Sequence, residues 1–403
     1  MRDGSMTFDD IIAPLTRERF LSEFWNKSLL HLRGQKGRFT PLLTWDELNM
    51  VLEWHSAPQP QGQKYCSIRL FRDGKMVDVR QYIDGPPGAA RLNAGGLIAG
   101  LSQGASLIMD QVQQVAPRVN HIAETLQDVF QGLAVANLYA GWSKQKAFTL
   151  HWDPQDVIIL QLSGRKHWKV HGPTRLHPLG DDIEKAPMPK GEPVFDGVLE
   201  DGDMLYLPRG WWHMAYPLDE PSLHLNFGIE PPNGTDFLQW WIRKMRRHPE
   251  IRQNLPQDAD AAARRAYFAG LLGLMESDRD HDWVGEFLRQ RNANRRMRPR
   301  VRLPFAPIEQ QEPLAMTTRI RLAYSQALFI EFEAGDRVAK FKAGDTNYSF
   351  PPGLIPAFER LSGSRGVSLG DLCAGIYDQQ LIGTLTGLLD VLANTGVILK
   401  EAS

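Results

Sequence analysis

Short hydrophobic runs, separated by turn residues, fill the middle of the chain between Leu133 and Glu230. Runs of this length at regular intervals are typical of strands in an all-β barrel or sandwich. The pattern therefore predicts a β barrel or sandwich that ends at Pro231 and Pro232. Its expected strands include Leu133–Tyr139, Asp156–Leu162, His167–His171, Met204–Leu207 and Leu223–Ile229.

On both sides of this barrel the hydrophobic residues recur at helical spacing. Before it, residues 15–25 and 91–130 predict helices, and short β-like runs lie between them in residues 67–83. Thr44 is followed three residues later by Glu47, which is the pattern of a helix capping box. After the barrel, residues 235–292 predict further helices, with Thr235 as the first N-cap.

The end of the chain mixes strand-like and helical spacing. Strand-like runs at 327–333 and 338–342 precede helical stretches at 354–361, 369–377 and 380–393, and a strand-like segment follows at 396–400. A small sheet with helices of this size suits a winged-helix-like module. We therefore expect an α+β chain in three parts: a barrel with N-terminal helices at 1–232, a helical region at 233–305 and a winged-helix-like domain at 306–403.

Composition narrows the class of protein. The 46 Lys and Arg against 47 Asp and Glu give a net charge of −1, which excludes a bulk nucleic-acid coat. The two cysteines, Cys66 and Cys373, exclude a disulfide framework and a cysteine-based zinc site. No signal-like or membrane-spanning apolar run is visible, so we expect a cytoplasmic protein with no membrane partner.

An arginine cluster from Arg289 to Arg302 is the local exception to this neutral balance. It could contact RNA or an acidic partner, although such runs are more often solvated helix ends. We therefore assign no direct nucleic-acid binding.

The segment that carries chemistry is His151-Trp152-Asp153, which leads directly into a predicted strand. In an extended chain, residues i and i+2 point to the same side, so His151 and Asp153 can share one metal ion. A second histidine would complete the two-histidine, one-carboxylate triad of non-haem Fe(II) oxygenases.

His213 is the preferred third ligand. It follows the turn, strand and stop of Gly202–Gly210, and two distant strands of a barrel can bring such groups to one mouth. His224 is the nearest competitor, but it sits within an apolar strand-like run. Isolated His-X-Asp patterns also occur by chance. A metal site is favoured because the His-X-Asp motif and the later His213 occur in this order within the β-rich region.

An oxygenase that uses 2-oxoglutarate also needs a cation for the far carboxylate of that cosubstrate. Lys166 or Arg165, at the start of the next strand, should face inward, although most lysines and arginines are solvated. Asn137 is a polar residue in an apolar strand and could reach the same cosubstrate, or merely satisfy a bulge.

At these motifs the sequence resembles the JmjC oxygenases, and more narrowly the ribosomal oxygenases that hydroxylate ribosomal proteins. The matching segments are His151–Asp153, Gln161–Trp168, Gly202–His213 and Ser222–Asn226. The segment Phe24–Leu30 is also similar, although Asn and Ser replace the charged and proline residues usual there. The similarity covers nearly the whole chain.

The resemblance implies a double-stranded β-helix (cupin/JmjC) barrel, a helical dimerisation region and a C-terminal winged helix. It implies that His151, Asp153 and His213 bind Fe(II), that Lys166 holds 2-oxoglutarate and that Asn137 is a second cosubstrate contact. The expected activity is that of a 2-oxoglutarate-dependent dioxygenase. With O2 as the other cosubstrate, it would hydroxylate an arginine or histidine side chain of a ribosomal protein, and the expected oligomer is a homodimer.

Three alternatives stay open. The same chemistry could hydroxylate a ribosomally made peptide or a small substrate, or demethylate N-methyl-lysine. A non-enzymatic cupin scaffold is disfavoured by the complete His-X-Asp and His set.

Clues to the substrate are fewer. A basic side chain could be received by Asp181, Asp182, Asp201 or Asp203, although turn positions favour aspartate for other reasons. Four tryptophans close to the motifs could line a peptide groove or only fill the barrel mouth: Trp142, Trp152, Trp211 and Trp212.

Overall fold

A computed structural model describes most of the chain and divides it into two compact units, Met1–Pro231 and Pro232–Ser403. The described residues are 6–56, 67–86, 90–143, 148–182, 187–277, 279–293, 314–323, 328, 330–332, 336–343, 346–363 and 366–400. Most of the arginine cluster falls outside these ranges. Among the described residues, no helix is both long and apolar enough to cross a membrane.

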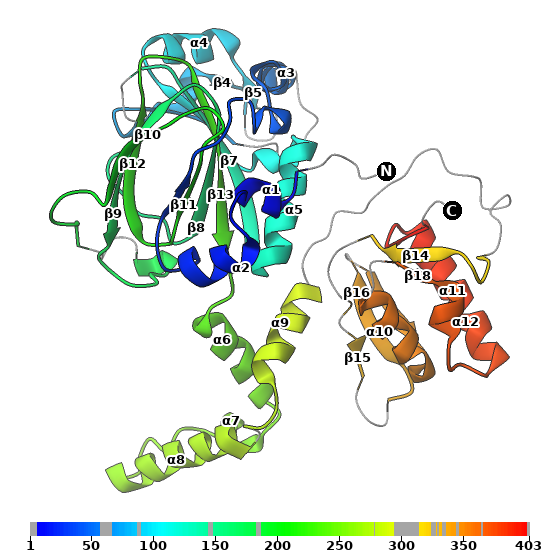
Figure 1. Cartoon of the computed structure of the whole chain (residues 1–403). Coiled ribbons are helices and arrows are strands. Elements are labelled where there is room, and N and C mark those ends of the chain that lie inside the picture. The colour runs from blue at the N-terminus through cyan, green and yellow to red at the C-terminus, as the bar shows by residue number, and fades with distance from the viewer. Residues whose placement is uncertain are drawn as a thin grey trace. The chain divides into compact units, whose positions relative to one another are not determined.

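Two antiparallel sheets form the barrel of the first unit. The described residues of the large sheet run in the order β1-β11-β8-β13-β7-β6-β2-β3, and those of the small sheet in the order β10-β9-β12. Figure 1 shows the two sheets facing each other, with β9, β10 and β12 opposite β7, β8, β11 and β13. The strands are β1 (Leu30–Leu32), β2 (Ile68–Arg72), β3 (Lys75–Met76), β6 (Ser106–Met109), β7 (Leu133–Gly141), β8 (Asp156–Ser163), β9 (Lys166–Pro173), β10 (Phe195–Leu199), β11 (Met204–Leu207), β12 (Trp211–Pro217) and β13 (Ser222–Glu230).

Alternation along the strands gives the large sheet two different faces. On β8, Val157 and Ile159 point inward and pack with Trp168 and Val170 of the small sheet. The next residues of the same strand, such as Ile158, point outward into a second, larger core. Because both faces of β8 are buried, its sequence is a continuous apolar run, as expected for a central strand.

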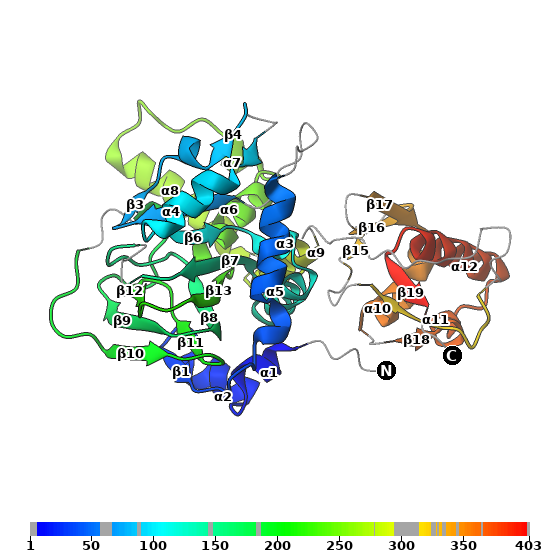
Figure 2. The ribbon, with the colours of Figure 1, turned by 90° about the horizontal axis from the view of Figure 1, so that it is seen from above.

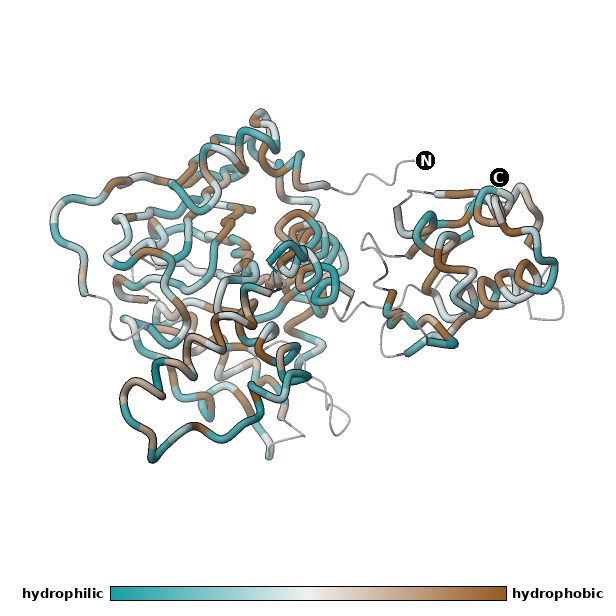
Figure 3. Tube along the Cα trace, turned by 90° about the horizontal axis from the view of Figure 1, so that it is seen from below, coloured by the Kyte–Doolittle hydropathy of each residue, from teal (hydrophilic) through white to brown (hydrophobic). Residues whose placement is uncertain are grey.

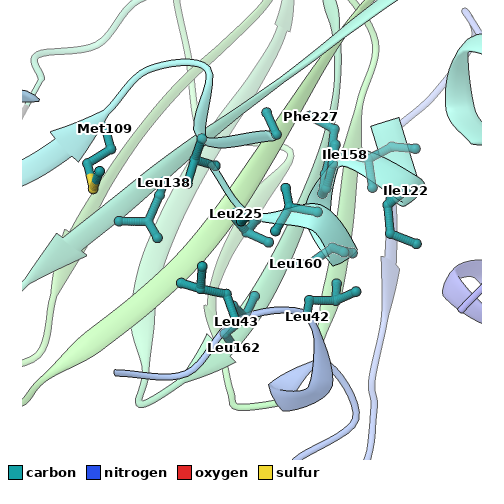
Figure 4. Close-up of a cluster of buried hydrophobic side chains, with 14 of the residues drawn as sticks. Leu42, Leu43, Met109, Ile122, Leu138, Ile158, Leu160, Leu162, Leu225 and Phe227 are labelled. Atoms are coloured by element: carbon teal, nitrogen blue, oxygen red, sulfur yellow. The ribbon is translucent and has the colours of Figure 1, made fainter. Parts of the chain in front are cut away.

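The outer core lies between the large sheet and the N-terminal helices. Figure 4 shows Leu160, Leu225 and Phe227 from the sheet meeting Leu42 and Ile122 from the covering segments. Ile122 belongs to α5 (Pro117–Phe130), which contacts β7 and β13. One face of the sheet is thereby covered by the N-terminal segments, while the other face lines the barrel interior.

The remaining N-terminal elements are short. They are α1 (Phe8–Ile12), α2 (Arg17–Arg19), η1 (Phe20–Phe24), η2 (Thr40–Leu42), α3 (Trp45–Ser56), η3 (Val79–Gln81), β4 (Ile83–Asp84), β5 (Arg91–Leu92), α4 (Ala94–Ser102), η4 (Val112–Gln114) and η5 (Gly180–Asp182). The predicted capping box of α3 is confirmed, since Glu47 N donates to Thr44 Oγ1 at 3.2 Å and Thr44 N donates to Glu47 Oε2 at 2.9 Å. Figure 2 gives a second view of α3 and α5.

The second unit begins with helices α6 (Gly234–Met245), α7 (Pro249–Arg252), α8 (Ala261–Ser277) and α9 (Trp283–Ala293). The prediction that Thr235 caps the first helix is wrong. Asn233 is the cap, because its Oδ1 accepts from the backbone of both Thr235 and Asp236, at 2.8 and 3.2 Å. The backbone of Asn233 is extended, with φ of −122° and ψ of 178°, and this places its side chain over the first turn of the helix.

The rest of this unit has its own core of helices and two small three-stranded sheets among the described residues. Its elements are β14 (Arg319–Leu322), β15 (Ile330–Glu331), β16 (Ala339–Ala343), β17 (Thr346–Phe350), η7 (Pro352–Leu354), α10 (Ile355–Gly363), β18 (Val367–Ser368), α11 (Leu369–Cys373), α12 (Gln379–Asn394) and β19 (Ile398–Lys400). Hydrophobic and hydrophilic stretches alternate along these helices in Figure 3. The predicted three-part division of the chain stays a prediction.

Several strands of the first unit escaped the sequence prediction, among them β1, β5, β6, β10 and β12. Residues 91–130 were expected to be helical throughout, but β6 interrupts α4 and α5 and pairs with β2 and β7. β10 and β12 were also missed, because Phe195–Leu199 contains a glycine and an aspartate and Trp211–Pro217 follows a turn without a break. Pairing across the sheet, rather than local pattern, determines these strands.

Gly202 makes the turn before β11 with φ of +95° and offers a stability test. A Cβ added there would lie 2.1 Å from Gln35 O, and the left-handed backbone disfavours any side chain. We expect Gly202→Ala to lower the free energy of unfolding by at least ~1–2 kcal/mol in urea denaturation. Gly180→Ala is the matched control, because its Cβ meets nothing within 4 Å. Equal stability of the two variants would contradict the argument.

Candidate metal centre

A backbone bridge brings His151 and His213 together. His213 N donates to His151 O at 2.7 Å, and His151 N donates to His213 O at 3.1 Å. His151 leads toward β8 of the large sheet, whereas His213 belongs to β12 of the small sheet. Residues that exchange both backbone hydrogen bonds project their side chains on the same face, and the two rings are accordingly 4.4 Å apart.

Asp153 joins the two histidines from the turn that leads into β8. Its Oδ2 lies 3.5 Å from His213 Nε2, and one ligand atom from each of the three residues lies within 4.8 Å of the others. The backbone of the same turn is fixed, because Gly210 N donates to Asp153 O at 2.8 Å. The structure therefore brings together the three residues that the sequence predicted as a metal site.

Both histidines are oriented in the same way. His151 Nδ1 lies 2.9 Å from Thr149 O, and His213 Nδ1 lies 3.0 Å from Trp211 O. A carbonyl can only accept, so each Nδ1 carries the proton and each Nε2 keeps its lone pair. This is the tautomer that a metal-binding imidazole requires.

Burial also keeps His213 neutral. Its side chain is buried, and desolvation together with the neighbouring His151 lowers its pKa to about 4. At neutral pH the ring is therefore uncharged and can donate an electron pair.

Lys166 points into the barrel from β9 and is buried, with 6% of its surface exposed. Burial lowers its pKa to about 7. Its Nζ lies 5.7 Å from the centroid of the Tyr139 ring, and among the described residues no carboxylate pairs with it. Arg165, the alternative cation, instead pairs with Glu220 at 3.0 Å near the surface. The inward cation is thus Lys166.

Asn137 also faces the interior, on β7, directly opposite Asn226 of β13. Its Oδ1 accepts from Gln111 N at 3.0 Å, which holds the segment before η4 against the sheet. The structure therefore gives Asn137 a local structural contact, and its predicted contact with a cosubstrate stays a prediction.

The sequence prediction missed a group of residues beside Lys166: Tyr139, Trp168 and His224. The ring of His224 stacks on Tyr139 at 4.8 Å and meets Trp168 edge-on at 5.7 Å. The sequence feature that could have revealed these residues is the two-residue alternation of strands. It places Tyr139 on the same face of its strand as Asn137, and Trp168 on the same face as Lys166. Burial raises the pKa of Tyr139, so its hydroxyl stays protonated. Burial and Lys166 lower the pKa of His224.

The suggested acidic contacts for a substrate are mostly used within the fold. Asp203 accepts from Gly34 N and His31 Nε2, each at 2.9 Å, and Asp201 accepts from Gly37 N at 2.9 Å. Asp182 pairs with Arg175 at 2.7 Å. Asp181 remains exposed.

Two of the four suggested tryptophans are buried and do not line a surface groove. Trp152 and Trp212 are buried, with 2% and 6% of their surface exposed. Trp211 packs against the interior core, and Trp142 against the outer one.

Comparison with known proteins agrees with this geometry. Residues 109–237 match the JmjC domain family. Relatives of known sequence include ribosomal oxygenase 1 of Gallus gallus, 28% identical over 69% of this chain. They also include the bifunctional lysine-specific demethylase and histidyl-hydroxylase NO66 of Drosophila persimilis, 28% identical over 55% of this chain. This chain spans only 45% and 31% of the length of those two proteins.

The fold is also that of solved structures. YcfD, a ribosomal oxygenase from Escherichia coli in complex with cobalt and 2-oxoglutarate, superposes with a TM-score of 0.57 at 19% identity. The match covers 96% of this chain and 99% of that one. A second YcfD structure, with cobalt and succinic acid, has a TM-score of 0.51. The mixed helical and cupin-type β architecture predicted from the sequence is thereby confirmed.

The residues present fit the metal and cosubstrate that this fold implies. Two neutral imidazoles and one carboxylate are the donor set of non-haem Fe(II) sites with open positions. Lys166 is a buried cation without a carboxylate partner among the described residues, which suits a cosubstrate with a free carboxylate.

Burial of Lys166 predicts a pH-dependent cost to stability. Below pH about 7 the ammonium is charged in both folded and unfolded states, so the desolvation cost is complete. Between pH 7 and 10.5 the unfolded chain binds more protons than the folded one, so stability rises with pH.

Lys166→Met should remove that cost. In the absence of any cosubstrate we expect the free energy of unfolding to rise by ~1–3 kcal/mol at pH 6, and the gain to shrink at pH 9. Urea denaturation at both pH values measures it. Arg165→Met is the control, because its exposed ion pair contributes little. A gain for Lys166→Met that does not change with pH would refute the explanation.

Proposed function

We propose that this chain, which carries a JmjC domain, is an Fe(II)- and 2-oxoglutarate-dependent protein hydroxylase. One observation carries the proposal: two histidines and a carboxylate converge with both Nε2 atoms free, inside the same barrel as an unpaired buried lysine. A purely structural cupin has no need of that buried charge, which costs stability.

His151, Asp153 and His213 would hold the iron. The bound metal would couple decarboxylation of 2-oxoglutarate and reduction of O2 to hydroxylation of a C–H bond. Lys166 would bind the far carboxylate of the cosubstrate, so that the orientation of the cosubstrate is fixed from both ends. The backbone carbonyls of Thr149 and Trp211 would keep both imidazoles in the metal-binding tautomer.

The proposed substrate is an arginine or histidine side chain of a ribosomal protein. The names of the relatives support this, since they are ribosomal oxygenases and a histidyl-hydroxylase. Lysine demethylation is the second candidate, because the same relative is also named a lysine-specific demethylase. Both reactions begin with the same hydroxylation, and they differ in whether the substrate carbon is attached to nitrogen.

We also propose a cytoplasmic homodimer with three functional parts. Helices in 233–305 would form the dimer interface, and exposed hydrophobic side chains support this: Leu238, Ile242, Phe268 and Leu272. The part after residue 306 would be a winged-helix-like domain. Its helices and small sheets support that assignment.

The deciding experiment is mass spectrometry of ribosomal proteins from cells with and without this gene. We expect one ribosomal protein to carry an additional oxygen on an arginine or histidine only when the gene is present. Re-expression of the wild-type protein should restore the modification, and re-expression of Asp153→Ala should not. An unmodified ribosome in both strains would reject a ribosomal substrate.

Loss of one metal ligand tests the centre itself. His213→Ala should lower 2-oxoglutarate turnover more than ~100-fold and weaken Mn(II) binding, because the site loses a neutral nitrogen ligand. Succinate release and calorimetry measure the two effects. His121→Ala, on α5 at the outer face of the large sheet, is the control and should behave as wild type. Succinate production that is unaffected by His213→Ala would show that another group binds the metal.

A further inference from the structure

A carboxylate is buried at the start of β8, on the face of the large sheet that the N-terminal segments cover. Asp156 opens the strand, shares the outer face with Ile158, and has none of its surface exposed. Tyr206 Oη donates to Asp156 Oδ1 at 2.6 Å and accepts from Asn26 N at 2.9 Å. The second oxygen, Oδ2, has no hydrogen-bond partner among the described residues. Burial of such a charge costs free energy unless a cation offsets it.

Asp156 lies where two segments that carry candidate metal ligands leave the sheet. Asp153 comes three residues before it. Pairing of β8 with β11 ends at Leu207, and the chain then turns toward His213. Beyond this ladder, Gly210 N donates to Asp153 O at 2.8 Å and so joins the two segments. Any group that fixes the turn after Leu207 therefore also fixes one ligand relative to the other.

Arg209 brings a positive charge to Asp156 from this turn. Burial raises the pKa of Asp156 to about 6, against the opposing effects of the Tyr206 hydroxyl and the charge of Arg209. Among the described residues, these two are the titratable groups that shift it. Arg209 Nε is itself buried and has no hydrogen-bond partner among the described residues. The negative charge of Asp156 thus attracts the residue next to Gly210.

We propose that Asp156 is a positioning residue for the metal centre, whose negative charge holds the turn at Arg209 and so keeps His213 in place beside Asp153. This inference rests on the proposed function and extends it to a residue outside the barrel interior. A proton on Asp156 would remove the attraction to Arg209, so the turn would be held less firmly. Because coupling between two sites is reciprocal, a bound divalent cation should favour loss of that proton.

Binding of Mn(II) to the full-length protein tests this without turnover, by calorimetry at two pH values. Asp156→Asn keeps an oxygen acceptor for Tyr206 but removes the charge. We expect it to bind Mn(II) about 10-fold more weakly than wild type at pH 7.5. At pH 5 the difference should shrink to about 2-fold, since wild-type Asp156 is then mostly protonated. Asp46→Asn, at an exposed carboxylate in the first turn of α3, is the matched control and should behave as wild type.

Tyr206→Phe provides a second, independent variant. It removes the hydroxyl that favours the charged form of Asp156, so the pKa of Asp156 should rise. The decline of Mn(II) affinity that is due to Asp156 should therefore begin at a higher pH than in wild type. Urea denaturation at both pH values verifies that each variant is folded, and if Asp156→Asn does not fold, the shift in Tyr206→Phe decides alone.

The outcomes separate positioning from general damage. The same fold-loss of Mn(II) affinity at both pH values would overturn the inference, because it would mean that Asp156→Asn only distorts the fold. Unchanged affinity of Asp156→Asn at pH 7.5 would also overturn it and leave the proposed function standing. If the wild-type protein does not bind Mn(II), the proposed function itself fails.

Discussion

The pair of backbone hydrogen bonds between His151 and His213 is the constraint on which the rest of the site depends. It joins the segment before β8 of the large sheet to β12 of the small sheet. Because an antiparallel pair of this kind fixes both spacing and side-chain direction, it sets the distance between the two imidazoles before any metal binds. Such preorganisation lowers the cost of assembling ligands from distant parts of the chain.

The orientation of the two imidazole rings is also fixed by the backbone. Each histidine donates from Nδ1 to the carbonyl two residues earlier, so the orienting acceptor is part of the segment that carries the ligand. The tautomer is therefore set by backbone carbonyls and not by another side chain. The backbone of Asp153 is held in a similar way, since its carbonyl accepts a hydrogen bond from the backbone of Gly210, three residues before His213.

Much of this site could be predicted from the sequence, because its signals are local. The spacing of His151 and Asp153, the strand after them and an inward-facing cation at Arg165 or Lys166 all follow from the geometry of an extended chain, whereas the choice of Lys166 was implied by the family resemblance. What could not be predicted is set by contacts across the barrel. The position of His224 beside Trp168 depends on the pairing of β13 with β7 and β8 and on the opposing sheet, and β6, β10 and β12 exist because of their partners. Asn233 displaced Thr235 as a cap by its backbone geometry, which composition does not reveal.

A buried lysine without a carboxylate partner among the described residues lowers the stability of the barrel. An apolar replacement would pack as well and leave no group without a partner. The core between the two sheets is otherwise apolar and includes Val157, Ile159 and Val170. Lys166 lies near the candidate metal ligands, since Trp168, two residues along β9, has its ring 6.1 Å from the ring of His213. An anion that pairs with Lys166 would offset this cost, so binding of such an anion and the stability of the barrel should be linked.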